Sequence, residues 1–228
     1  LKFFIDQENT IRGTNIIIID PAASLGAAPE YKRMCEKKNG TYISFSKDSK
    51  NIPAIMGLHT GDFLEDVFAI EHVLSVMLGG EQGISKAQEP WLEKAILQAF
   101  EMVGISSDIP SSWKKEPPRL KHLHIALKKL FREAKSENAR MSIEALLSRL
   151  SRFIDDGMYS FIDQTGTELR IDNSFTVFEF KNTPSQIKET LTAIVMNYVK
   201  AKAMGNTDKT IIVLEEAPIW LKHEVLAD

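Results

Sequence analysis

Four consecutive isoleucines, Ile16 to Ile19, constrain the fold of this 228-residue chain more than any other feature. β-branched residues favour extended backbone, and the run is bounded by Gly13 on one side and by Asp20-Pro21 on the other. A strand with one face in water alternates apolar and polar residues, whereas an unbroken apolar run is typical of a strand covered on both faces. The run therefore predicts a buried strand of a parallel sheet.

The segments around this strand and near the end of the chain predict further sheet and helix. Two more β-rich runs occur late in the sequence, and an amphipathic helical pattern separates them. A strand–helix–strand order with buried strands indicates a parallel crossover, so we expect an α/β fold with a mainly parallel sheet. The expected elements are helices over residues 1–12, 30–38 and 187–199 and strands over 14–20, 42–45, 175–180 and 210–214.

The middle of the chain has a different character, because every periodic stretch between residues 58 and 154 has helical spacing. Ser85 and Gln88 match the spacing of a capping box, which predicts that a helix opens at Ser85. We therefore divide the chain into a first part of the core (1–57), an inserted all-helical subdomain (58–154) and a return to the core (155–228).

The composition is that of an ordinary soluble globular protein, with 43% hydrophobic and 26% charged residues. No apolar run approaches the roughly 20 residues that a membrane-spanning helix needs. The single cysteine, Cys35, cannot form an internal disulfide, which fits a reducing compartment. A net charge of -3 argues against indiscriminate binding of nucleic acid. We expect a cytoplasmic protein.

Charge is nevertheless uneven, because residues 114–140 hold nine basic residues against three acidic ones. One interpretation is a solvated helix face. The other is a docking surface for an acidic protein or for DNA phosphates. The sequence leaves both open.

Carboxylates at the ends of two expected strands are the strongest chemical signal. Glu215 and Glu216 directly follow the apolar run 211–214, and Asp20 follows Ile19. Ligands of open parallel sheets bind beyond the carboxyl ends of the strands. An acidic pair there resembles a Walker B motif, in which one carboxylate holds the Mg²⁺ shell and the other orients the attacking water. The plainer interpretation is that apolar strands often end in acids and that Asp20-Pro21 is only a turn.

A glycine-rich phosphate loop does not occur in the sequence, since no stretch reads G-x-x-x-x-G-K-[ST]. A helix followed by a buried strand is nevertheless what normally comes after such a loop. We therefore expect the loop immediately upstream of Leu1. The histidines show no metal-ligand spacing, and the three tryptophans are interpreted as packing residues.

The order of these segments resembles one family. A helix is followed by "RGTNIIIIDP" and "PEYKRMCEKKNGTYISFS", then come the helical insert, "NSFTVFEFKN", another helix and "KTIIVLEEAPIWLK". This is similar to the ATPases of conjugation and type IV secretion called VirB-four or, in F-type systems, TraC. The matching positions are Asp20, Pro21, Glu30, Tyr31, Glu215, Glu216, Ala217 and Trp220.

The resemblance implies a RecA-like P-loop NTPase core that binds ATP and Mg²⁺ and energises conjugative DNA transfer, type IV secretion and pilus assembly. It implies that Glu216 is catalytic, that Glu215 binds Mg²⁺ through water, and that Glu215 and Asp20 contribute to the nucleotide site. The implied partners are other secretion ATPases, inner-membrane components and further copies of the chain, at the cytoplasmic face of a bacterial inner membrane.

The chain departs from the family at three places. The Walker A loop is absent, Glu215 stands where the family has Asp, and the stretch Ala22–Ala28 is unlike the polar turn expected there. A DNA-translocating motor of the HerA/FtsK kind and a non-catalytic assembly module that docks through residues 114–140 remain the alternative hypotheses.

Overall fold

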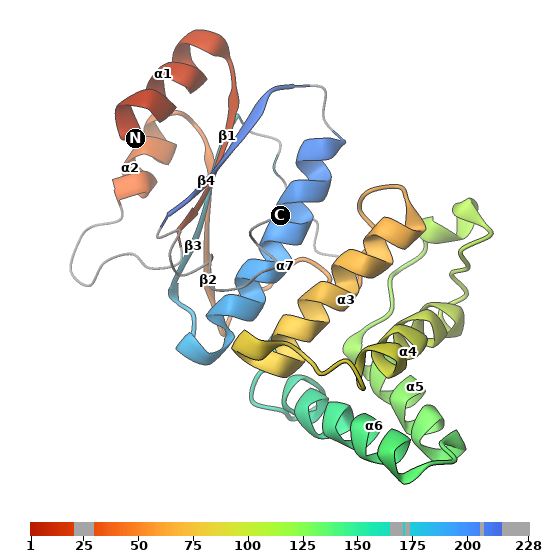
Figure 1. Ribbon diagram of the computed structural model, residues 1–228. Helices are drawn as coiled ribbons and strands as arrows, with labels where there is room; N and C mark the ends of the chain where they lie inside the picture. The colour runs from red at the N-terminus through yellow and green to blue at the C-terminus, as the bar shows by residue number, and fades with distance from the viewer. Residues whose placement is uncertain (21–29, 165–170, 172–173, 206–207, 216–228) are drawn as a thin grey trace. The chain divides into compact units, whose positions relative to one another are not determined.

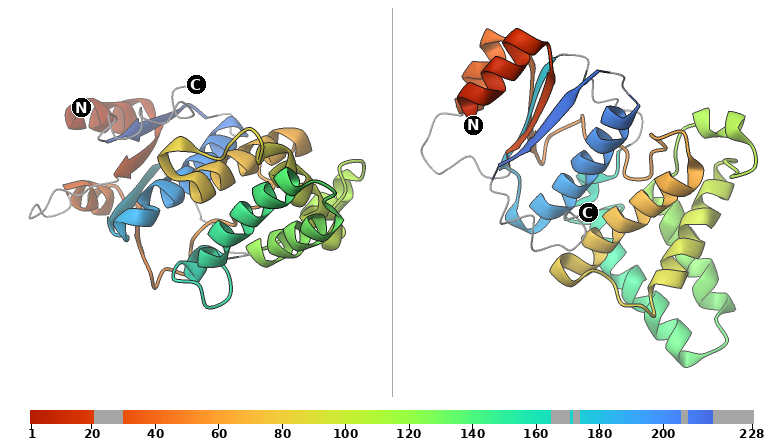
Figure 2. Two further views of the ribbon diagram at one scale, coloured as in Figure 1. Left: turned by 60° about the horizontal axis from the view of Figure 1, so that its bottom comes forward. Right: turned by 45° about the horizontal axis from the view of Figure 1, so that its top comes forward.

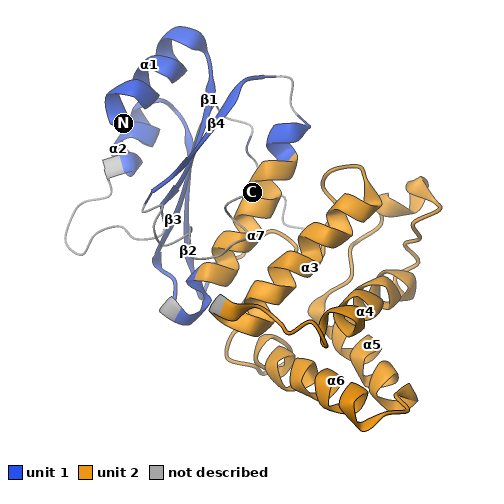
Figure 3. Cartoon of the chain, viewed as in Figure 1, with its two compact units in different colours: residues 1–49, 169–188, 202–228 blue, residues 50–168, 189–201 orange. Residues whose placement is uncertain are grey.

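The computed structural model of the chain describes most of its length as two compact units (Figures 1 and 3). The described residues are 1–20, 30–164, 171, 174–205 and 208–215. Unit 1 comprises residues 1–49, 169–188 and 202–228, and unit 2 comprises residues 50–168 and 189–201.

Unit 1 contains a four-stranded sheet in which every described pair of neighbouring strands is parallel. The strands lie in the order β2-β3-β1-β4, so β1 is central. Their bounds are Asn15–Asp20 for β1, Thr41–Ser46 for β2, Phe175–Asn182 for β3 and Thr210–Leu214 for β4. The predicted α/β class with a mainly parallel sheet is confirmed.

The isoleucine run occupies the middle of this sheet, and its four side chains are at most 4% exposed. On one face, Ile16 and Ile18 belong to a core cluster with apolar residues of β3 and β4 and with residues of two helices. These helices are α1 (Lys2–Arg12) and α2 (Glu30–Lys37), which lie beside this face in Figure 2. The run is buried as expected: its strand is central in the sheet, and residues of α1 and α2 pack on the face that carries Ile16 and Ile18.

The connection from α1 to β1 is held by a buried carboxylate. Gly13 ends the helix in the left-handed conformation, with φ of 64°, which glycine adopts without strain. Glu8, only 4% exposed, accepts hydrogen bonds from Arg12 at 2.6 Å, from Thr14 at 3.3 Å and from Lys209 at 3.1 Å. One side chain thus ties α1 to the starts of both β1 and β4.

All regular secondary structure among the described residues of unit 2 is helical. Its long helices are α3 (Phe63–Gly79), α4 (Glu89–Met102), α5 (Leu120–Glu133) and α6 (Glu137–Leu150). Short 3₁₀ helices lie in the connections from α3 to α4 and from α4 to α5. It also includes residues 189–201 of α7 (Ser185–Met204). The helices expected here are present, whereas the boundaries 57/58 and 154/155 stay a prediction.

The helix expected at Ser85 begins later, at Glu89, so that part of the prediction is wrong. Gln88 does reach back to Ser85, accepting from its backbone amide at 2.9 Å. However, residues 86–88 form a separate turn closed by the bond from Gln88 N to Ser85 O at 2.8 Å. Pro90 then occupies the first turn of α4, where its missing amide hydrogen costs nothing.

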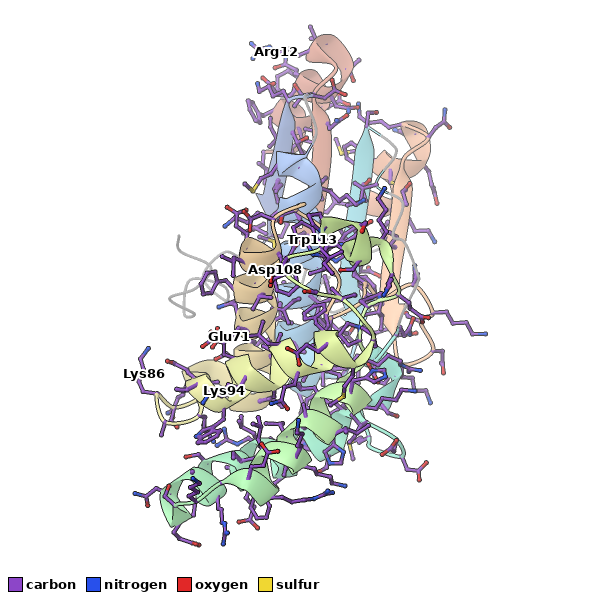
Figure 4. The ribbon with its side chains drawn as sticks, turned by 90° about the vertical axis from the view of Figure 1, so that its right-hand side faces the viewer. Arg12, Glu71, Lys86, Lys94, Asp108 and Trp113 are labelled. Carbon is purple, nitrogen blue, oxygen red and sulfur yellow. The ribbon has the colours of Figure 1, made fainter. Side chains whose placement is uncertain are left out.

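Aromatic packing organises the start of α3. The Phe63 ring lies 5.4 Å from Phe100 of α4 and 5.9 Å from Trp113, which is labelled in Figure 4. The Trp113 indole donates to the Ser106 carbonyl at 2.8 Å. Trp113 is therefore a packing residue, as predicted. In the described part of the chain, no helix has the length and apolar character needed to cross a bilayer.

Candidate functional site

The strand register aligns four polar residues at the carboxyl edge of the sheet. Glu179 of β3 pairs with Asp20 of β1 on one side and with Ser44 of β2 on the other. Glu215 directly follows Leu214, the partner of Ile19, and its amide donates to the Ile19 carbonyl at 3.0 Å. We call Ser44, Glu179, Asp20 and Glu215 the acidic row, since they cross all four strands in spatial order.

The acidic row lies on the sheet face covered by α1 and α2. Side chains alternate between faces along a strand, so residues two apart point the same way. Glu179 and Asp20 come two residues after Val177 and Ile18, which belong to the core cluster on that face. The row is therefore where this apolar face gives way to polar groups.

A tyrosine from α2 holds one end of the row. Tyr31, 7% exposed, donates a hydrogen bond from its hydroxyl to Oε1 of Glu215. Burial raises the pKa of Tyr31 well above its usual range, and the nearby Glu215 and Asp20 carboxylates raise it further. The hydroxyl stays protonated, so it acts as a permanent donor that orients Glu215.

Glu179 is the most deeply buried acid of the row, at 5% exposed. Its Oε2 accepts a hydrogen bond from the Ser44 hydroxyl at 2.9 Å. Its Oε1 is buried and has no partner in hydrogen-bonding geometry among the described residues. Burial raises the pKa of Tyr42, and the Glu179 carboxylate raises it further, so a second protonated hydroxyl faces the row.

The chemistry of the row suits a hard cation, because all its side-chain donors are oxygens. Across the described residues, no three His, Cys, Asp or Glu side chains stand in the geometry of a ready-made metal site. Mg²⁺ does not need one, since it usually keeps several waters and takes one or two carboxylates together with substrate phosphates. The row therefore fits a hydrated Mg²⁺ better than a metal enclosed by protein ligands.

Two of the three acids singled out from the sequence meet in this row. Asp20 and Glu215 stand at the ends of adjacent strands, and both contribute to the raised pKa of Tyr31. Glu216 lies outside the described residues, as do Pro21, Ala217 and Trp220.

Sequence reasoning missed Glu179 and Ser44. The available signal for Glu179 was a lone charge inside the apolar run 175–180, which is unusual for a strand buried on both faces. No comparable signal marks Ser44, because the sequence does not show the register between β2 and β3.

The basic segment is exposed along α5, within unit 2. Lys121, Lys128 and Arg132 follow one another at intervals of seven and four residues, which places them on one exposed stripe of the helix. Two other cations have structural partners: Lys115 donates to the Gly104 carbonyl at 2.7 Å, and Arg119 lies 3.4 Å from Asp163.

A cavity of about 420 Å³ opens at the start of α5. Its lining residues are Val103, Lys115, Glu116, Pro117, Arg119, Lys121 and His122. The basic segment thus combines structural cations with exposed ones, and both interpretations of it stay open.

Comparisons with known proteins place the fold. No family model matches the chain, and no curated protein matches it. Among solved structures, VirB4 of Thermoanaerobacter pseudethanolicus matches with a TM-score of 0.70 and 20% sequence identity, over 96% of this chain and 82% of that one. At this identity the likeness establishes the fold. The chain therefore has the RecA-like α/β fold of this VirB4 structure, as its sequence predicts.

Proposed function

We propose that this chain belongs to an ATPase of type IV secretion and supplies the magnesium-binding and water-activating part of its nucleotide site. The observation that carries the proposal is the Glu215 carboxylate, held by Tyr31 beside Asp20 at the carboxyl edge of the sheet. Ligands of open parallel sheets bind at this edge. The fold shared with VirB4 supports the proposal.

In this proposal Glu215 and Asp20 would hold waters of the Mg²⁺ that accompanies ATP, with Tyr31 keeping Glu215 oriented. Glu216 would orient the attacking water. Mg²⁺, when bound, would supply charge neutralisation at the phosphates. The sequence has no G-x-x-x-x-G-K-[ST] loop, so the proposal requires a phosphate-binding loop from residues other than these 228.

The finer biological role is part of the same proposal. ATP hydrolysis would energise conjugative DNA transfer and pilus assembly at the cytoplasmic face of a bacterial inner membrane. The partners would be other secretion ATPases, inner-membrane components and further copies of the chain. The support for this role is the shared fold with VirB4 together with the matching motif order in the sequence.

The direct test is ATP hydrolysis by the full-length protein and by its Glu216→Gln variant. We expect the variant to bind ATP normally, because the phosphate contacts are intact, and to lose turnover, because the water is no longer activated. The Glu215→Gln variant should instead need more Mg²⁺ for half-maximal activity. Unchanged hydrolysis by Glu216→Gln would remove the assignment of the site.

The same assay separates a DNA-translocating motor from a secretion ATPase. A motor of the HerA/FtsK kind should hydrolyse ATP faster when DNA is added, and its DNA binding should weaken steeply with salt. A rate of ATP hydrolysis that does not change when DNA is added favours the secretion role.

The exposed basic stripe of α5 favours a second function, docking of an acidic partner. Replacing Lys128 and Lys129 by Glu should then abolish capture of that partner and leave the ATPase rate unchanged. Both side chains are exposed, so the fold should tolerate the change. Capture that survives the double replacement would leave this surface as a solvated helix face.

A further inference from the structure

Glu179 is a buried acid with an unpaired oxygen, and the roles proposed for the other acids do not explain why it is there. Its side chain is 5% exposed, and its Oε1 has no hydrogen-bond partner among the described residues. Buried polar groups are nearly always hydrogen-bonded, and leaving one unpaired costs free energy, more so for a charged group. A carboxylate kept in this state indicates a ligand that completes it.

The surroundings of Glu179 indicate what that ligand is. Asp20 is its register partner on β1, and neighbouring strands lie about 4.7–4.9 Å apart. Glu215 stands at the end of the next strand. The register thus brings three carboxylates onto adjacent strands, and a cation beside them would favour their charged forms.

The contacts of Glu179 also fix the direction in which it binds. Ser44 donates to Oε2 and holds that oxygen on the β2 side. The Tyr42 hydroxyl also interacts with this carboxylate, but Oε1 has no partner in hydrogen-bonding geometry among the described residues. Ser44 thus anchors Oε2, and Oε1 is left as the oxygen that can accept a hydrogen bond from a ligand at the acidic row.

We propose that Glu179 is a positioning residue whose Oε1 accepts a hydrogen bond from a water of the hydrated divalent cation at Asp20 and Glu215. This inference rests on the proposed function, since it concerns the same cation. Glu179 acts through water, which agrees with the lack of three direct metal ligands in the described part of the chain. Its role is to orient the waters around the cation, as carboxylates beyond the direct ligands do in other metal sites.

The test is Mn²⁺ binding, measured by electron paramagnetic resonance on the full-length protein with a non-hydrolysable ATP analogue. The Glu179→Gln variant keeps the size of the side chain and removes its charge. We expect it to bind Mn²⁺ about 10-fold more weakly. Its melting temperature should stay the same or rise, because a buried charge beside other acids has been removed.

A matched control comes from the same strand. Thr176 is fully buried in β3 and, like Glu179, has a side-chain oxygen without a hydrogen-bond partner. Thr176→Val should leave Mn²⁺ affinity unchanged, since Thr176 precedes the carboxyl edge. If Glu179→Gln fails to fold, Ser44→Ala decides instead: it frees Oε2 and should also weaken Mn²⁺ binding.

The outcomes separate this inference from the proposed function. A wild-type protein that neither binds Mn²⁺ with the analogue nor hydrolyses ATP would overturn both. Normal wild-type binding and hydrolysis, with equal Mn²⁺ affinity in Glu179→Gln, would overturn only the inference. Weaker Mn²⁺ binding together with a lower melting temperature would assign Glu179 a structural role and overturn it as well.

Discussion

Replacing Tyr31 by Phe isolates the hydrogen bond that holds Glu215. The substitution removes one oxygen from a side chain that is 7% exposed, so packing is kept and only the bond is lost. A hydrogen bond to a charged group contributes about 1.5–3 kcal/mol. Glu215 is only half-buried, so water can replace part of the lost interaction. We therefore expect the lower value, a loss of about 1.5 kcal/mol in the free energy of unfolding.

Urea unfolding followed by circular dichroism measures this loss, provided that the dependence on urea concentration stays the same. Tyr159→Phe is the matched control, because it removes the same atom from an equally buried tyrosine in unit 2. Among the described residues, the Tyr159 hydroxyl accepts one long hydrogen bond of 3.4 Å from Arg152, so its loss should cost less than about 0.5 kcal/mol. Equal effects of the two substitutions would refute the reasoning, because the Glu215 bond would then contribute nothing specific.

Three further predictions concern other carboxylates. Hydrogen bonding from Lys209 lowers the pKa of Glu8, so Glu8→Gln should lower the melting temperature above pH 4.5, with the deficit disappearing as the pH falls through the lowered pKa. Asp62 caps α3 by accepting from two backbone amides, so Asp62→Ala should cost about 1 kcal/mol in urea unfolding. Burial raises the pKa of Asp163 from 3.8, so its charged form costs stability as the pH rises. Asp163→Asn, which can still accept from Leu120, should melt higher than wild type at pH 7 and equally below pH 3.8, whereas a lower melting temperature at pH 7 would contradict this.

The fold was largely predictable because each core element carries its own local signal. Ile16–Ile19 indicated a strand buried on both faces without any knowledge of its neighbours, and Gly13 marked the end of the preceding helix. The prediction that a helix begins at Ser85 was wrong, because the bond from Gln88 N to Ser85 O closes a separate turn there. The order of the strands was not predictable, since it depends on contacts between distant segments.

The candidate site was predictable only in part, for the same reason. Asp20 and Glu215 each follow an apolar run, which is visible in the sequence. The place of Glu179 beside Asp20 depends on the register between β1 and β3, which no local pattern encodes. The bond from Tyr31 to Glu215 likewise joins residues that only the folded sheet brings together.

The pairing pattern of the sheet has a consequence for how the chain is made. β1 and β2 do not pair with each other, and both depend on β3, which begins at Phe175. At translation rates of about 5–20 residues per second, the ribosome needs roughly 10 s to pass from β2 to β3. During that interval β1 and β2 lack β3, the described strand that pairs with both, while helices α3 to α6 are already emerging. The helices between β2 and β3 can therefore fold before β1 and β2 are joined into one sheet.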